Sequence, residues 1–275
     1  MSANTDDKNG LTQFRIAVNE EFSTVFSHFY VAENYSEQAV TRTLLPSYQT
    51  LLAFNFGTAI RLLPPNDASV ASGNVLAIGP VKQAFNYTMP QNSKLLVVNL
   101  KNDAFFRFFG TAEVAERFAV NPDELIGIPC FSLLWQTLNL LPDVNQQINH
   151  ILAFCRPYLK ESSVIASQLS EFNNDNLDPI KSIALKDRLT ERHIQLQHQK
   201  HLGYSAKAHH RYKRFLKATE IVSNHNSIKI NINWLQIVAD CGYYDQSQLI
   251  KDFKYYLNLT PKQYARQQHS IYTAR

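Results

Sequence analysis

The stretch from Gly242 to Lys254, GYYDQSQLIKDFK, places polar side chains at the start of a run with helical periodicity. Asp245 is a preferred N-cap residue, so a helix is predicted to begin directly after it. The exposed positions of its first turns are then Gln246, Ser247, Gln248 and Lys251. Glutamine can pair with adenine, serine is adaptable, and lysine can reach guanine or a phosphate, so these side chains suit contact with a nucleic acid.

The same helix needs a buried face to hold that polar surface in place. Leu249 and Phe253 lie four residues apart and are expected to face the protein core. Gln248 equally suits a capping box with Asp245, in which its side chain bonds the helix start and not a base. The two roles of Gln248 are compatible, and both stay open.

An offset of 55 residues aligns this stretch with an earlier one, because residues 189–207 match residues 244–262 in character. Thr190, a good N-cap, stands where the second copy has its aspartate cap. Gly203 stands where the second copy has Asn258, and these two residue types best tolerate the left-handed conformation that ends a helix. Each copy therefore predicts a cap, about three helical turns and a stop.

The first copy offers its own contact candidates. Its exposed early positions carry Glu191, Arg192, Gln195 and Leu196. Arg192 and Gln195 suit contact with a base or a phosphate, whereas Leu196 is not expected to read sequence. Arg192 is the strongest candidate of the four.

A shorter helical segment precedes each copy, at residues 179–188 and 234–243. A short helix, a tight turn and a longer helix make a helix-turn-helix unit, whose second helix fits a major groove about 12 Å wide. The segment AKAHHRYKRFLKATEIV joins the two units. Its residues Tyr212, Phe215 and Ala218 are predicted to be buried between them.

The C-terminal sequence resembles the DNA-binding domain of the AraC/XylS family. The run WLQIVADCGYYDQSQLIKDFKYYLNLTPKQYA shows the family's alanine, glycine-aromatic pair, DQS-like cap, Phe-Lys pair and Thr-Pro ending. The matching residues are Ala239, Gly242, Tyr243, Asp245, Ser247, Phe253, Lys254, Thr260, Pro261 and Tyr264. The resemblance covers about residues 181–270 and implies two recognition helices in separate major-groove segments. Residues 43–127 more loosely resemble the β-rich N-terminal domain of a subgroup of these regulators.

The first unit departs from the family pattern at four positions. Members commonly carry a basic residue where Leu196 stands, aromatic residues where His198 and His209 stand, and proline where Ala206 stands. A buried histidine needs a hydrogen-bond partner, and its burial as a cation is costly. We therefore expect the second unit to carry most of the sequence specificity.

Charge divides the chain. Residues 1–180 carry 11 Lys and Arg against 17 Asp and Glu, a net charge of −6, and residues 181–275 carry 16 against 6, a net charge of +10. A basic part of this size favours a polyanion such as nucleic acid as partner. The candidates for phosphate contact are Lys207, Arg211, Arg214 and Lys262, with Lys213 and Lys217 as neighbours.

Before the basic part, short apolar segments separated by Pro, Gly, Asn and Ser over residues 38–100 are typical of an antiparallel sandwich or barrel. Helical periods follow in NDAFFRFFG, TAEVAERFAV, FSLLWQTLNLL and VNQQINHILAFCRPYLK. The predicted fold class is α+β, in three parts. These are a β-sandwich or barrel-like domain with C-terminal helices over 1–170, a linker over 171–180, and an all-α double helix-turn-helix domain over 181–275.

The last helix of the first domain leaves two alternatives open. Its apolar face consists of Val144, Ile148, Ile151, Leu152, Cys155 and Leu159. Such a face packs on the sheet of its own domain or on a second copy of the chain, because helical spacing does not decide between them.

The family resemblance implies that the β domain binds an effector or mediates dimerisation. The candidates for lining a pocket are Tyr48, Phe54, Phe56, Phe85 and Tyr87. Aromatics at strand spacing more often form core, however. Arg61 or Lys82 could meet an anionic ligand, although a surface position is commoner for such residues. The ligand itself is not predicted.

Catalysis, a cofactor and a metal site have no support in the sequence. GxSxG, HExxH, P-loop and GxGxxG motifs are absent, and Cys130, Cys155 and Cys241 lack metal-ligand spacing. No apolar run is long enough to span a bilayer, and the stretch MSANTDDKNGLTQF has no basic region followed by an apolar one, as a signal peptide would. We expect a cytoplasmic protein without a membrane partner.

Two functions follow as alternatives. The first is a sequence-specific transcriptional regulator of double-stranded DNA, with a small-molecule effector, a homodimer and RNA polymerase as candidate partners. The second is a ligand-binding or protein-binding β domain whose basic helical module binds nucleic acid only weakly or non-specifically. An enzyme fused to a DNA-binding tail has the least support.

Overall fold

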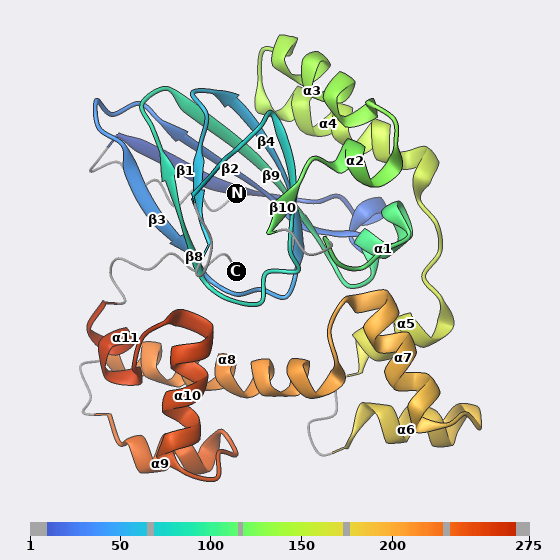
Figure 1. Cartoon of the computed structure of the whole chain (residues 1–275), viewed down its shortest axis with the longest axis vertical. Coiled ribbons are helices and arrows are strands. Elements are labelled where there is room, and N and C mark those ends of the chain that lie inside the picture. The colour runs from blue at the N-terminus through green and yellow to red at the C-terminus, as the bar shows by residue number, and fades with distance from the viewer. Residues whose placement is uncertain (1–9, 65–68, 115–117, 173–176, 228–231, 268–275) are drawn as a thin grey trace.

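The computed structural model describes residues 10–64, 69–114, 118–172, 177–227 and 232–267. Its N-terminal part consists of two antiparallel sheets (Figure 1). The six-stranded sheet contains, in spatial order, β1 (Leu11–Ala17), β2 (Phe26–Asn34), β9 (Ser93–Leu100), β4 (Thr50–Gly57), β7 (Val75–Ile78) and β10 (Ala119–Val120). The four-stranded sheet contains β3 (Val40–Leu44), β8 (Phe85–Met89), β5 (Arg61–Leu63) and β6 (Val70–Ala71). The predicted antiparallel β domain is confirmed.

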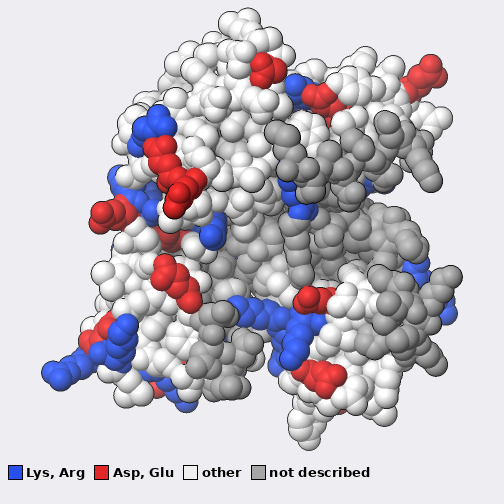
Figure 2. Space-filling view, turned by 180° about the vertical axis from the view of Figure 1, so that it is seen from behind, with Lys and Arg blue, Asp and Glu red and all other residues white. Residues whose placement is uncertain are grey.

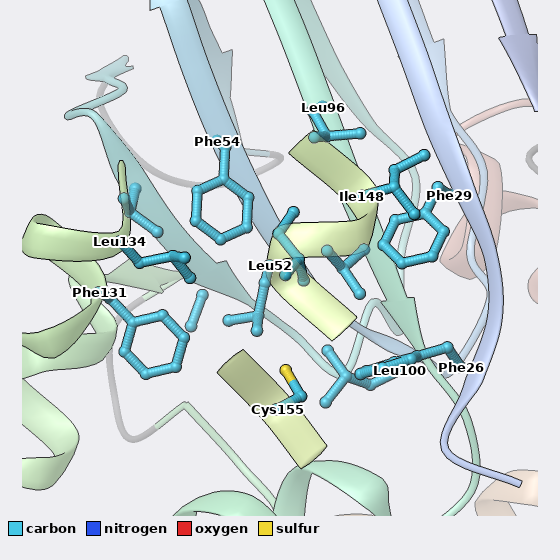
Figure 3. Close-up of a cluster of buried hydrophobic side chains, with 14 of the residues drawn as sticks. Phe26, Phe29, Leu52, Phe54, Leu96, Leu100, Phe131, Leu134, Ile148 and Cys155 are labelled. Carbon is cyan, nitrogen blue, oxygen red and sulfur yellow. The ribbon is translucent and has the colours of Figure 1, made fainter. Parts of the chain in front are cut away.

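The six-stranded sheet is buried on both faces, which explains why β4 reads as an almost unbroken apolar run. Successive side chains of a strand point to opposite faces. Leu51 and Ala53 accordingly pack in the cluster between the two sheets, and Leu52 and Phe54 pack in the cluster on the opposite face. Figure 3 shows this second cluster, in which side chains of the sheet meet those of the helices.

Helices cover that opposite face. They are α1 (Ala104–Phe109), α2 (Pro122–Ile126), α3 (Cys130–Leu140) and α4 (Val144–Cys155), with short 3₁₀ turns at Glu20–Phe22 and Arg156–Tyr158. In Figure 3, Ile148 and Cys155 of α4 lie among side chains of the sheet, and Ile151 and Leu152 belong to the same cluster. The apolar face of this helix therefore packs on the sheet of its own domain, the first of the two predicted alternatives.

One predicted helix of this domain is wrong. The segment TAEVAERFAV has a helical period, but its described residues form no helix, and Ala119–Val120 is strand β10. Val120 pairs with Ala77 of β7 and is buried. Pairing with the edge of the sheet outweighs a local helical pattern that is only ten residues long.

The described residues of the C-terminal part form helices and the turns between them. The helices are α5 (Val164–Glu171), α6 (Pro179–Asp187), α7 (Glu191–Leu202), α8 (Ala206–Ser227), α9 (Trp234–Asp240), α10 (Gln246–Leu257) and α11 (Pro261–Gln267). Figure 1 shows α8 running between the pair α6–α7 and the pair α9–α10, below the sheets. Leu169 of α5 belongs to the buried cluster of these helices, so α5 lies with them although it precedes the predicted linker. No helix in the described ranges is long and apolar enough to cross a membrane.

Phe54 provides a test of the shared core. Its side chain is fully buried between the six-stranded sheet and the helices. We expect Phe54→Ala to lower the free energy of unfolding by about 3–5 kcal/mol, because it leaves a cavity. Urea unfolding followed by circular dichroism measures this loss. Gln136→Ala, at an exposed position of α3, should change stability by no more than about 0.5 kcal/mol.

Candidate nucleic-acid interface

The second helix-turn-helix unit consists of α9, a turn and α10. Asn233 caps α9 by accepting from the backbone N–H groups of Leu235 and Gln236, each at 3.2 Å. The turn requires a positive φ of 70° at Gly242, which a glycine adopts without strain. Asp245 then caps α10, since its Oδ1 accepts from the backbone N–H of Gln248 at 2.8 Å. The predicted cap is confirmed.

The two faces of α10 separate as the sequence predicts. Leu249 and Phe253 are buried, and the ring of Phe253 lies edge-on to Phe215 of α8 at 5.2 Å between centres. The predicted contact residues Gln246, Ser247, Gln248 and Lys251 are all exposed. Their exposure is compatible with contact to DNA, and that contact stays a prediction.

Gln248 takes part in the helix start, though not in the predicted pairing. Its side-chain oxygen lies 3.4 Å from the backbone nitrogen of Tyr244, the residue before the cap. A reciprocal capping box exists instead one helix later. There the Thr260 N–H donates to Gln263 Oε1 at 2.8 Å, and the Gln263 N–H donates to Thr260 Oγ1 at 3.2 Å.

The first unit repeats this construction with α6 and α7. Thr190 Oγ1 accepts from the backbone N–H of His193 at 3.2 Å. Gly203, with φ of 77°, ends α7 as Asn258, with φ of 57°, ends α10. Ser205 then caps α8 by accepting from the N–H of Ala208 at 3.1 Å. The repeat read from the sequence is therefore structural.

The contact candidates of the first unit lie beside a groove of about 940 Å³ between the α5–α6 region, α7 and the start of α8. Glu191, Arg192, Gln195 and Leu196 are exposed and line this groove. Leu196 is 51% exposed, so a large apolar side chain stands where α10 has Lys251. The two recognition helices thus present different chemistry at matching positions.

The histidines at the departing positions are packed with aromatic rings. His198 is buried, and its Nδ1–H donates to the carbonyl oxygen of Tyr204 at 2.6 Å. Burial lowers the pKa of His198. The ring of His209 lies 5.3 Å from Tyr204 and 6.2 Å from His198 between centres. Both imidazoles are therefore accommodated in the neutral form, and His198 has the partner that its burial requires.

The linking helix α8 connects to the second unit through a buried charge. Arg211 Nε donates to Asp252 Oδ1 of α10 at 2.6 Å, and Arg214 Nη2 lies 3.8 Å from Asp252 Oδ2. The Arg214 guanidinium also lies 4.6 Å from the centre of the Tyr243 ring. Two of the four phosphate candidates are therefore engaged within the protein. The predicted burial of this helix is confirmed at Tyr212, Phe215 and Ala218.

The other two phosphate candidates, Lys207 and Lys262, are exposed. Figure 2 shows Lys and Arg side chains across the lower half of the molecule, over the C-terminal helices, with Asp and Glu side chains among them. Contact of all four candidates with phosphate stays a prediction.

The β domain contains a small cavity of about 60 Å³ between its two sheets. Of the predicted pocket aromatics, Phe85 and Tyr87 line it. Phe54 and Phe56 point to the helical side of the sheet, and Tyr48 packs among the C-terminal helices.

Neither predicted cation lines this cavity. Arg61 is exposed, and Lys82 pairs with Glu113 at 2.8 Å. The basic side chains on the wall are Arg15 and His28. Burial, with the charge of Arg15, lowers the pKa of His28 to about 4. In the described part of the chain, no group of three or more His, Cys, Asp or Glu side chains could hold a metal ion.

Two structurally important residues, Asp252 and Tyr48, are not predicted in their observed roles. Asp252 follows Leu249 by three residues, so the two side chains share the buried face of the helix. This spacing could have indicated from the sequence that the Asp252 carboxylate needs a cationic partner. Tyr48 lies in a loop more than 150 residues from the helices it contacts, and no local pattern indicates such a contact.

Asp252→Asn tests the buried charge. We expect it to lower the free energy of unfolding by about 2 kcal/mol, because it leaves Arg211 and Arg214 without a carboxylate at α10. The loss stays below that of a fully buried pair since the Arg211 side chain is 38% exposed. Urea unfolding provides the measurement. Glu220→Gln, the same change of charge at an exposed position of α8, should leave stability within about 0.5 kcal/mol.

Acid is expected to destabilise the C-terminal helices through His209. Burial, with Lys213, His198 and His210 nearby, lowers the pKa of His209 from 6.5 to about 4. His209 therefore binds a proton more tightly in the unfolded chain than in the folded one. The stabilisation from neutral His209 is complete above pH 6.5 and is lost as the pH falls toward 4. The unfolding free energy of His209→Phe should therefore fall less steeply over this range than that of the wild type. His193→Phe, at an exposed position, should keep the wild-type slope.

Comparison with known proteins bears on the second unit. Residues 225–266 match the family of bacterial regulatory helix-turn-helix proteins, AraC family. The match contains α9, α10 and nearly all of α11 and excludes α6 and α7. No curated protein is similar enough to the chain to count as a match.

Solved structures show only distant likeness. ToxT from Vibrio cholerae O395 is 11% identical, with a TM-score of 0.41, over 94% of this chain and 97% of that chain. Wild-type ToxT from Vibrio cholerae strain SCE256, bound to an unsaturated fatty acid, is 13% identical, with a TM-score of 0.40, over 88% and 95%. An RmlC-like cupin protein from Desulfovibrio desulfuricans is 15% identical, with a TM-score of 0.26, over 36% and 89%. Such values give no ground for carrying over what those proteins bind.

The family match and the geometry agree on the same residues. The matched range holds the positive-φ turn at Gly242, the Asp245 cap, the buried Leu249 and Phe253, and the exposed polar start of α10. Residues 225–266 are therefore a helix-turn-helix domain of the AraC family.

Proposed function

We propose that the protein is a sequence-specific DNA-binding transcriptional regulator in which α7 and α10 enter separate major-groove segments of one DNA duplex. One observation carries the proposal. Two helices with matching caps present polar first turns, and in Figure 1 both extend from the β domain with those turns at the far end. A helix end of this kind is what direct readout in a major groove uses.

Charge and surface position support the same function. The net charge of +10 over residues 181–275 suits a phosphate backbone. The exposed first turns contain Gln246, Ser247 and Lys251 in one unit and Arg192 and Gln195 in the other. These side chains offer the donors and acceptors that distinguish base pairs in the major groove.

The second candidate function is weak or non-specific binding of nucleic acid by the same helices. The exposed Leu196, beside the groove at α7, favours it, because leucine has no hydrogen-bonding group with which to read a base. On this alternative α10 alone would contact bases, and affinity would depend mainly on salt.

The β domain is proposed to control DNA binding through a small-molecule effector. The supporting feature is the cavity between the sheets, with apolar walls and the basic side chains Arg15 and His28. At about 60 Å³ it holds only a few water molecules, so a larger effector requires the two sheets to separate. The proposal includes no catalytic step.

A homodimer is proposed as well. The support for it is the exposure of two large apolar side chains on α3, Leu133 and Leu140. RNA polymerase stays a candidate partner of the regulator.

Selection of genomic DNA fragments by the purified protein separates the two functions. A regulator retains a few fragments over random DNA of equal length, and this preference persists as the salt concentration rises. A purely electrostatic binder retains all fragments alike and loses them together as salt rises. Equal retention of genomic and random DNA would contradict sequence-specific regulation.

Lys251→Ala and Arg192→Ala test the assigned contacts. Each should weaken binding to a selected fragment by about 1–3 kcal/mol, roughly 5- to 150-fold, while circular dichroism shows an unchanged fold. Fluorescence anisotropy at fixed salt concentration measures the affinity. Lys160→Ala, which removes the same charge from an exposed site next to the β domain, is the matched control and should bind like the wild type. Wild-type affinity in both test variants would remove these residues from the interface.

A further inference from the structure

The β domain holds the C-terminal end of α10. The backbone N–H of Ala84 donates to the carbonyl oxygen of Tyr256 at 2.8 Å, and the side-chain amide of Gln83 donates to the carbonyl oxygen of Tyr255 at 3.0 Å. These carbonyls belong to the last turn of α10, where they have no partner within the helix. Two loop residues of the β domain therefore complete the end of α10 that lies opposite Gln246.

The β domain also holds the C-terminal end of α7. Gly203 lies so close to Ala112 that a Cβ at this glycine would be 2.6 Å from the Ala112 carbonyl oxygen. Two residues before Gly203, the ring of His201 lies 4.3 Å from the ring of Phe106 in α1, measured between centres. Lys200 Nζ lies 5.7 Å from the centre of the Phe106 ring. The end of α7 is thus packed against the β domain on two sides.

Between these two contacts, Tyr48 enters the helical domain. It is only 7% exposed, and its ring stacks on Tyr212 of α8 at 4.4 Å and meets Tyr204 edge-on at 4.8 Å. The Tyr212 hydroxyl donates to the carbonyl oxygen of Pro46 at 2.6 Å. Tyr48 has a φ of 55°, which a non-glycine residue rarely adopts, so its surroundings hold it in this conformation.

The segments 46–48, 81–84 and 112–113 are joined to one another within the β domain, and we call them the brace. The N–H groups of Ser47 and Tyr48 both donate to the Val81 carbonyl oxygen, at 3.1 and 3.0 Å. Lys82 pairs with Glu113 at 2.8 Å. The brace is therefore one connected surface that touches α7, α8 and α10.

We propose that the brace fixes the distance and orientation between α7 and α10, and that Tyr48 is a positioning residue for DNA binding by both units at once. The brace touches the ends of the recognition helices that lie away from their polar first turns, so it orients the helices without covering them. Because α8 joins both units in one chain, the second contact to DNA is intramolecular in any case, and fixing the two helices relative to each other lowers the ordering cost of that contact. The part of this inference that concerns DNA rests on the proposed function.

The first experiment needs no DNA. Spin labels at Gln195→Cys in α7 and Gln246→Cys in α10 report the distance between the helices by pulsed electron resonance. The background carries Cys130→Ser, because that thiol is only partly buried, whereas Cys155 and Cys241 are buried. The full chain should give one narrow distance distribution, and Tyr48→Ala should broaden it. An unchanged distribution in Tyr48→Ala overturns the proposal.

Three further variants keep this result interpretable. Tyr48→Phe keeps the stacked ring and should give the wild-type distribution. Tyr158→Ala removes an exposed tyrosine of the N-terminal part and should have no effect. If circular dichroism shows that Tyr48→Ala is unfolded, Tyr48→Leu, which keeps much of the buried volume but no ring, takes its place and should still broaden the distribution.

The second experiment uses a selected DNA fragment with two half-sites and the same fragment with one half-site scrambled. Unlabelled Tyr48→Ala should lose about tenfold in affinity for the intact fragment and nothing for the scrambled one. If Tyr48→Ala binds the intact fragment as tightly as the wild type does, or more tightly, the proposal is overturned. If no DNA is selected at all, the proposed function fails, and the spin-label distances still decide whether the brace fixes the two helices.

Discussion

The position of α8 is the constraint on which both helix-turn-helix units depend, and contacts between buried aromatic rings set it. Phe215 of α8 lies 4.4 Å from Tyr256 and 5.2 Å from Phe253 between ring centres, so α8 and α10 share one core. One turn earlier on α8, Tyr212 lies 4.4 Å from Tyr48 of the β domain. Aromatic pairs combine a large buried area with preferred geometry. α8 therefore cannot shift against α10 or the β domain without separating buried rings.

The features that the sequence predicts best are those decided within a few residues. Thr190 and Asp245 are identifiable as caps, and Gly203 and Asn258 as helix ends, because capping involves only backbone groups one turn away. The 55-residue repeat adds a second, independent instance of the same pattern. The exposure of all eight early positions named on α7 and α10 follows from these caps, since a fixed helix start also fixes which side chains lie on which face.

The features that the sequence could not predict depend on distant partners. Tyr48 is a candidate for a ligand pocket by its sequence, but its ring packs against α8, and nothing near residue 48 specifies that contact. Val120 lies in a segment with a helical period and forms a strand, because β7 offers a partner. The apolar face of α4 is predictable, but only the structure shows that Ile148 packs on the domain's own sheet. Periodicity gives a face, and tertiary contacts determine what covers it.

The buried pairing at Asp252 bears on how the positive charge of the C-terminal part can act. Asp252 is 5% exposed and pairs with Arg211, whose guanidinium also lies 4.4 Å from the centre of the Tyr255 ring. Leaving such a carboxylate unpaired is costly, so Arg211 would have to keep this bond while it approaches a phosphate. Arg211 can bind a phosphate only through those N–H groups of its guanidinium that do not bond Asp252. Part of the positive charge of Arg211 is already offset by Asp252. Exposed lysines such as Lys207 and Lys262 carry no such constraint from Asp252. On the proposed function, counterion release is therefore expected mainly from these lysines, and the two arginines are expected mainly to orient α10.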